Sequence, residues 1–138
     1  MYRAAVAFLL LWSMLASGQD EPDFYAGRTV SMLVGSGPGG LTDTSARLIA
    51  RFLERHIPGE PTVIVQNMPG GGGVTMANHV FRSAPRDGTV MGYSSPGMIT
   101  AELLEPNRAK YQGNRLNWIG SAFRSTNTIA VLDTAGAI

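Results

Sequence analysis

The stretch VGSGPGGLTD, residues 34–43, joins a run with the composition of a buried strand to a run with helical spacing. The strand is expected over Thr29–Val34, because its residues are mostly apolar or β-branched and glycines flank it. Thr42 or Asp43 is expected to cap the helix, which should continue to about His56. The sequence therefore indicates a strand, a glycine turn and a helix in immediate succession.

The same pattern recurs along the chain. A second strand is expected over residues 62–65, a second glycine loop over 67–73 and a second helix over 75–82. A third strand over 89–93 leads into a polar turn at 94–97, with a short helix after it at 99–104 and a further strand at 128–132. Repeated strand, loop and helix units with short connections predict right-handed βαβ crossovers, a parallel sheet and the α/β fold class.

The first 18 residues have the layout of a secretory signal peptide: a basic start, an apolar core and small residues before the cleavage site. An uncleaved anchor or a buried helix is the alternative. Without the leader the chain has equal numbers of acidic and basic residues, so its charge gives no argument for nucleic acid. The absence of cysteine excludes disulfides and thiolate zinc sites. We expect an exported protein with one modest domain.

Three glycines of the first turn form the G-x-G-x-x-G pattern of dinucleotide-binding folds: Gly35, Gly37 and Gly40. That fold also requires an acidic residue at the end of the second strand, where this chain has Asn67. Pro38 removes a backbone N–H from the turn, and Leu41 stands where a phosphate-binding P-loop needs lysine. A Rossmann-like nucleotide-dependent enzyme fragment therefore remains only the alternative.

Both glycine loops are expected to follow the carboxyl end of a strand and to precede a helix. Unpaired backbone N–H groups and the helix dipole favour an anion at such a position. Glycine permits close approach of the backbone and a concave arrangement of N–H groups. Two such loops side by side would hold one carboxylate without lysine or arginine. The alternative is that they are only tight turns.

Five blocks in a fixed order carry a resemblance to a known family. They are FYxGRTV (24–30), VGxxPGGxxD (34–43) followed by AR (46–47), HIPGxPTVIVQNMPG (56–70), APxDGTVxG (84–92) and NWxGS (117–121). In this order and spacing the chain resembles the substrate-binding proteins of the tripartite tricarboxylate transporter family, which are periplasmic solute receptors. Members of that family are about twice as long, so the resemblance implies a chain truncated to about its N-terminal half.

The resemblance implies the N-terminal part of a two-lobed periplasmic-binding-protein (Venus-flytrap) fold. Residues 1–18 would be the signal peptide, 19–120 an incomplete first α/β lobe and 121–138 the crossover into a second lobe. The implied function is an extracytoplasmic receptor for a small carboxylate, a di- or tricarboxylate or a related organic acid. It would be a periplasmic monomer and not an enzyme, would deliver its ligand to the membrane subunits of a tripartite tricarboxylate-type transporter, and would bind no nucleic acid. A truncated, non-functional remnant is a further alternative.

The resemblance also implies which residues hold the ligand, through backbone N–H groups and bridging waters. The expected substrate-binding residues are Ser36, Gly37, Gly39, Gly40, Thr42, Asp43, Asn67, Gly70, Gly71, Gly72, Gly73, Ser94 and Ser95. Asp43 is equally suited to orient water or to cap the helix, and Asn67 to bond ligand or turn. Neither serine has a recognisable base nearby in the sequence, and no histidine lies in a metal-binding cluster. We therefore expect no catalytic residue, metal or cofactor.

Overall fold

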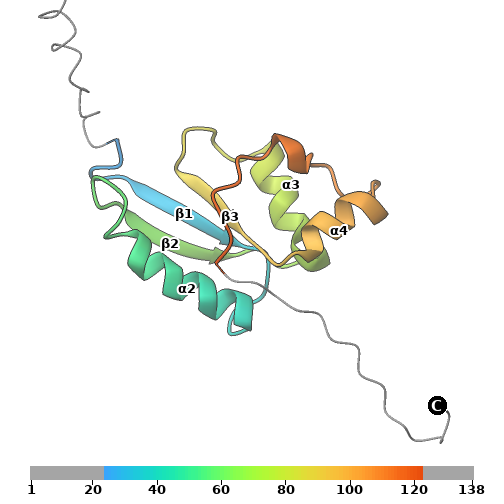
Figure 1. The fold of residues 1–138 in the computed structure, drawn as a ribbon, viewed down its shortest axis with the longest axis horizontal. Helices are drawn as coiled ribbons and strands as arrows, with labels where there is room; N and C mark the ends of the chain where they lie inside the picture. Colours follow the sequence, from blue (N-terminus) through green and yellow to red (C-terminus); the bar gives the residue numbers. More distant parts are fainter. Residues whose placement is uncertain (1–23, 123–138) are drawn as a thin grey trace, which may run out of the picture.

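The computed structural model of the protein describes residues 24–122, which contain a three-stranded parallel sheet of order β2-β1-β3 (Figure 1). The strands are β1 (Thr29–Val34), β2 (Thr62–Asn67) and β3 (Val90–Tyr93). The expected α/β class is confirmed, and β2 runs two residues further than the sequence predicted. The leader at 1–18 and the strand expected at 128–132 lie outside the described residues.

The central strand β1 aligns the ends of its two neighbours. Val34, the last residue of β1, pairs with Asn67 on one side and with Tyr93 on the other. All three strands therefore end at the same level, and the loops that follow them begin at one edge of the sheet. This is the edge where open parallel sheets bind ligands.

Helix α2 (Leu41–Leu53) covers one face of the sheet. Ala46 and Ala50 are buried against β1, and two partly buried residues, Ile49 and Leu53, complete the contact. The predicted capping is wrong: Gly40 is the N-cap and no side chain caps the helix, so neither Thr42 nor Asp43 has that role.

The helix also ends earlier than the predicted His56. After Leu53 the backbone tightens, since Arg55 and His56 donate to the carbonyls three residues before them, at 3.2 and 3.0 Å. The turn that leads to β2 therefore begins within the segment that the sequence assigned to the helix.

Helices α3 (Val74–Arg82) and α4 (Gly97–Leu104) lie away from α2 (Figure 1). Met91 and Tyr93 pack with the α2 core, so Gly92 between them points to the opposite face. A Cβ on Gly92 would lie 2.7 Å from the sulfur of Met76 in α3, so α3 packs closely on that face. The sheet is therefore covered on both sides, as in doubly wound folds.

The two later helices have a hydrophobic cluster of their own. Its buried members are Val74, Ala77, Met98, Ala101, Ala109 and Tyr111. The Tyr111 hydroxyl donates to the Met98 carbonyl, which ties the chain after α4 back to the start of that helix. A short 3-10 turn, η2 (Gly113–Arg115), follows. Within residues 24–122 no helix is long and apolar enough to cross a membrane.

Candidate functional site

Three loops meet at the carboxyl edge of the sheet. We name them the first glycine loop (residues 35–40), the second glycine loop (68–73) and the third loop (94–96). A Cβ added to Gly35 would lie 2.7 Å from the Ser94 Oγ and 2.9 Å from the Gly73 Cα. Side chains at these glycines would therefore force the loops apart, and their absence lets the loops touch.

The outer sides of the glycine loops face open space. A Cβ built on Gly37, Gly39, Gly40 or Gly72 would have no atom of another residue within 4 Å. The loops are in contact near the sheet, and these four glycines leave their backbone accessible further out. Glycine with open space beside it permits close approach of a ligand to the backbone.

The second glycine loop depends on glycine at every position from Gly70 to Gly73. Their φ angles are 137°, 55°, 64° and 100°, a region that other residues rarely adopt. The Gly70 carbonyl accepts from the N–H groups of Gly73 and Thr75, at 3.1 and 3.3 Å, which closes the loop into a compact turn, η1 (Gly71–Gly73). The turn leads directly into α3, which begins at Val74, one residue before the predicted start.

Asp43 is the most heavily bonded acidic side chain at this edge, and it is 3% exposed. Its carboxylate accepts from the Gly39 N–H at 2.8 Å, from Arg47 Nε at 3.0 Å and from Asn67 Nδ2 at 2.8 Å. The hydrogen bond from Arg47 is the main cause that lowers the pKa of Asp43 to about 2, and the bonds from Gly39 and Asn67 add to it. Asp43 therefore remains a carboxylate and holds the first glycine loop in shape.

Asn67 connects the end of β2 to the first glycine loop. Its Nδ2 also donates to the Ser36 carbonyl at 3.0 Å, and its Oδ1 accepts from Arg47 Nη2 at 2.9 Å. All the hydrogen bonds of this side chain thus go to the first loop and to α2. Of the two roles expected for Asn67, the geometry supports the turn.

The structure brings the sequence-predicted residues to one edge of the sheet. The first loop contains Ser36, Gly37, Gly39 and Gly40, the first turn of α2 contains Thr42 and Asp43, and β2 ends with Asn67. The second loop contains Gly70, Gly71, Gly72 and Gly73, and the third loop begins with Ser94 and Ser95. Ser95 is exposed, whereas the Ser94 Oγ is buried and has no hydrogen-bond partner among the described residues.

Arg108, which follows α4, is not among the residues that the sequence pattern indicated. A Cβ on Gly71 would lie 2.6 Å from the Arg108 Nη2, so the guanidinium lies directly against the second glycine loop. No sequence signal places a residue so far along the chain beside this loop. Only the packing of α4 on α3 brings it there.

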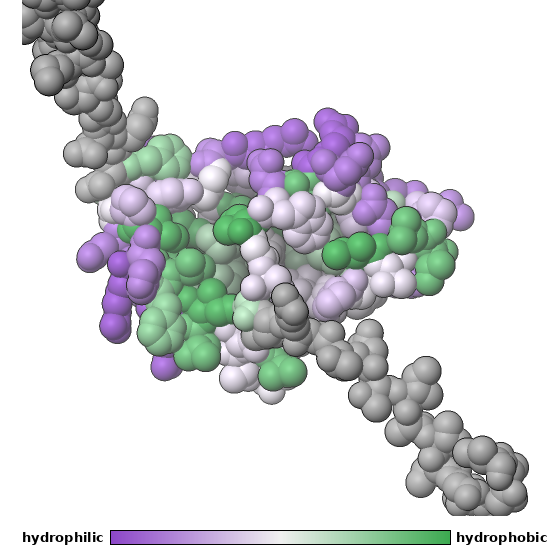
Figure 2. Space-filling view, in the orientation of Figure 1, coloured by the Kyte–Doolittle hydropathy of each residue, from purple (hydrophilic) through white to green (hydrophobic). Residues whose placement is uncertain are grey.

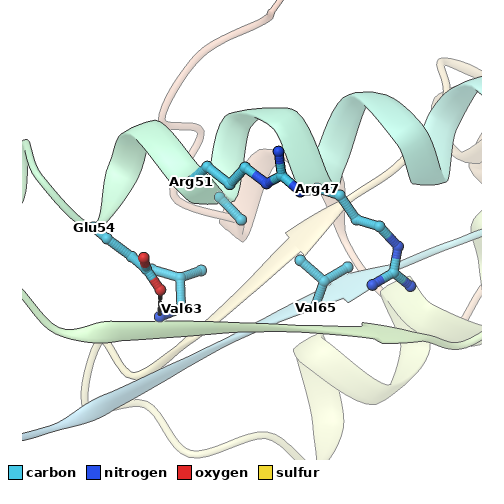
Figure 3. A pocket seen from close by; sticks show the side chains of 6 residues that line it. Arg47, Arg51, Glu54, Val63 and Val65 are labelled. Carbon is cyan, nitrogen blue, oxygen red and sulfur yellow. Dashed lines mark hydrogen bonds between the residues drawn. The ribbon is translucent and has the colours of Figure 1, made fainter.

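A cavity of about 220 Å³ lies away from the loops, between α2 and the outer edge of β2 (Figure 3). Val63 and Val65 form its floor, and Arg47, Arg51 and Glu54 reach over it from the helix. The Glu54 Oε1 accepts from the Val63 N–H at 2.8 Å, which occupies a backbone donor of the edge strand. This arrangement protects the edge of the sheet.

The groups that hold nucleotides or metals are not found at the loops. Asn67, in place of an acidic residue, ends β2, and Leu41 is 81% exposed where a P-loop has its lysine. Among residues 24–122 no three histidine or acidic side chains lie close enough together to hold a metal ion. His56 is instead bonded to the Phe52 carbonyl at 2.7 Å.

The three-stranded parallel sheet, with helices on both faces and glycine loops at its carboxyl edge, defines an α/β protein. Comparison with known proteins gives the family. The chain is 38% identical to Protein BugT of Bordetella pertussis over 81 residues, 59% of this chain and 24% of the relative. It is 33% identical over 104 residues to the UPF0065 protein in the TAR-I ttuE-ttuC' intergenic region of Agrobacterium vitis, 75% of this chain and 29% of the relative.

A third relative is the UPF0065 protein in the tcbD-tcbE intergenic region of Pseudomonas sp. strain P51, 31% identical over 93 residues, 67% of this chain and 26% of the relative. No family model matches the chain. The resemblance found in the sequence is nevertheless confirmed: the chain is a relative of the Bug, or tripartite tricarboxylate receptor, family. It spans about a quarter of the length of the curated relatives that it matches.

Proposed function

We propose that the chain forms part of an extracytoplasmic receptor for a small carboxylate, a di- or tricarboxylate or a related organic acid. The ligand carboxylate would lie in front of the two glycine loops and accept hydrogen bonds from their backbone N–H groups, directly or through water. The receptor would pass its ligand to the membrane subunits of a tripartite tricarboxylate-type transporter.

One observation carries this proposal: two glycine-rich loops touch at the carboxyl edge of the sheet, at Gly35 and Gly73, and glycines of both loops have open space beside their backbone. Backbone N–H groups at a helix N-terminus attract anions. Arg108 lies beside the second loop and is paired with the exposed Glu105 carboxylate, whereas Asp43 is bonded on all sides and points into the first loop. The attraction for a negatively charged ligand would therefore come first from the backbone N–H groups.

The organisation of the longer receptor follows from the same proposal. Residues 19–120 would belong to the first lobe of a two-lobed, Venus-flytrap receptor, and 121–138 would lead into the second lobe. Residues 1–18 would be removed as a signal peptide, and the mature receptor would be a periplasmic monomer. The kinship with Bug and UPF0065 proteins supports a receptor over the nucleotide-dependent enzyme.

Thermal shift measurements with a ligand panel test the proposal. Acetate, succinate, malate and citrate are compared with NAD and ATP on the purified chain. A carboxylate at 100 times its Kd should stabilise the fold by about 2.7 kcal/mol. Stabilisation by nucleotides alone would favour the nucleotide-dependent enzyme over the receptor. Absence of a response to every compound would favour a truncated, non-functional remnant.

A pair of glycine substitutions tests whether the loops are the site. Gly37 and Gly120 both have open space where a Cβ would go, but only Gly37 lies in a glycine loop. Gly37→Val should therefore fold normally and weaken carboxylate binding at least about tenfold, a loss of roughly 1.4 kcal/mol. Gly120→Val is the matched control and should bind as the native chain does. Equal binding by both variants would exclude the first glycine loop.

A further inference from the structure

The glycine run of the second loop, Gly70 to Gly73, has no side chains, so side-chain chemistry beside this run must come from other residues. Gly70 to Gly73 all have positive φ, and no larger residue fits there without strain. The neighbour that reaches the loop is Arg108. Its Nη2 and Cζ would lie 2.6 and 3.6 Å from a Cβ on Gly71.

The backbone of Arg108 is fixed in position by α3, the helix that the second glycine loop begins. Asn78 in α3 donates from Nδ2 to the Arg108 carbonyl at 3.0 Å, and its Oδ1 accepts from the Lys110 N–H at 2.6 Å. The Arg108 N–H donates to the Glu105 carbonyl at 2.9 Å. Loop and arginine are thus attached to the same helix, which keeps the guanidinium beside the loop.

The guanidinium is held at one end and accessible at the other. Its Nη1 forms an ion pair with the Glu105 carboxylate, and its side chain is 58% exposed. Arginine offers N–H donors in a planar fork that fits a carboxylate, so an anion in front of the loop can take the place of Glu105 at the guanidinium. Glu105 is itself exposed, and an exposed pair of this kind is weak.

We propose that Arg108 is a ligand-contacting cation of the carboxylate site and that Glu105 competes with the ligand for it. The inference rests on the proposed function. A backbone N–H gives the carboxylate a hydrogen bond in which only the acceptor is charged, whereas Arg108 adds one in which donor and acceptor are both ionised and which its planar fork can make bidentate. The ion pair with Glu105 holds the guanidinium in place when the site is empty and is exchanged for the ligand carboxylate on binding.

Isothermal titration calorimetry with succinate and citrate tests the assignment in the native chain and three variants. Arg108→Gln should weaken binding about tenfold or more, since a hydrogen bond to a charged group is lost. It should also reduce the dependence of Kd on sodium chloride. Arg108→Lys should keep part of the affinity, because it retains the charge without the fork. Glu105→Gln should tighten binding severalfold, because the competing carboxylate is gone.

Arg115→Gln is the matched control. Arg115 lies over the ring of Phe81, 5.8 Å from its centre, and its loss should leave Kd unchanged. Unfolding curves of every variant separate a folding defect from a binding defect. If the native chain binds succinate or citrate and Arg108→Gln binds equally well with the same salt dependence, this inference fails and the proposed function stands. If the native chain binds no carboxylate, both fail.

Discussion

Asp43 is buried yet ionised, because three hydrogen-bond donors surround its carboxylate. Gly39, Arg47 and Asn67 come from the first glycine loop, α2 and β2, so one side chain fixes the relative position of three segments. Its exposed fraction of 3% means that water cannot replace these partners. Removing the charge would therefore loosen the first glycine loop as well as the end of β2.

The pH dependence of stability follows from this carboxylate. The folded pKa of about 2 lies below the ordinary value of 3.8, so the stabilisation is complete above about pH 4 and is lost as the pH falls through about 2. Asp43→Asn should lower the urea midpoint at pH 7 and flatten the loss of stability between about pH 4 and pH 2. Glu60→Gln, at an exposed acid outside this network, is the control. A native pH profile in Asp43→Asn would contradict the role of the carboxylate.

At position 73 both the backbone conformation and the adjacent Ser94 side chain require glycine. Its φ is 100°, and an added Cβ would clash with the Ser94 Oγ. Gly73→Ala should reduce the free energy of unfolding by roughly 2 kcal/mol, of which the left-handed backbone alone accounts for about 1–2 kcal/mol. Gly37→Ala, at a position with open space, should change it little.

The partner of Gly73 permits a second test of the same contact. Ser94→Ala removes a buried hydroxyl that has no partner among residues 24–122, so it should be neutral or slightly stabilising. In that background Gly73→Ala should cost less than it does alone, as measured by urea unfolding. Strict additivity of the two substitutions would show that their side chains do not interact.

At the scale of the elements, β2 is an edge strand whose outer backbone donors need protection. Glu54, at the end of α2, accepts from the Val63 N–H at 2.8 Å, and Arg47 and Arg51 place charges over the same edge (Figure 3). The helix that covers one face of the sheet thus also protects its edge.

Removing that protection should cost stability. Glu54→Ala should lower the free energy of unfolding by about 1 kcal/mol, the usual contribution of one hydrogen bond. Glu54→Gln retains an acceptor and should cost less. Light scattering at high protein concentration should detect association of Glu54→Ala through the freed edge. An alanine variant as stable and as monodisperse as the glutamine variant would remove Glu54 from this role.

The sequence predicted the elements better than the contacts between them. The three strands and the apolar face of α2 were predictable because apolar residues with the right period are bounded by glycine and proline. The start of α2 was not, because Gly40 caps the helix by its backbone alone while Asp43 bonds the loop. Arg108 was not predictable either, because tertiary packing alone brings it to Gly71.

At the scale of the whole molecule, the described residues contain two hydrophobic clusters joined by α3. Met76 of this helix packs against Gly92 of the sheet, while Val74 and Ala77 belong to the cluster with α4. Figure 2 shows apolar surface over α4 as well, where Leu103 is 77% exposed. The buried and the exposed side of α4 should therefore respond very differently to substitution.

Substitutions on α4 test whether the two clusters unfold together. Met98 is 7% exposed, and Met98→Ala should cost about 2–5 kcal/mol. Leu103→Lys, on the exposed side of the same helix, should stay within about 0.5 kcal/mol. Because α3 joins the clusters, Met98→Ala should accelerate amide hydrogen exchange in β1 as much as in α4. Faster exchange in α4 alone would mean that the sheet with its glycine loops folds independently of the segment that carries Arg108.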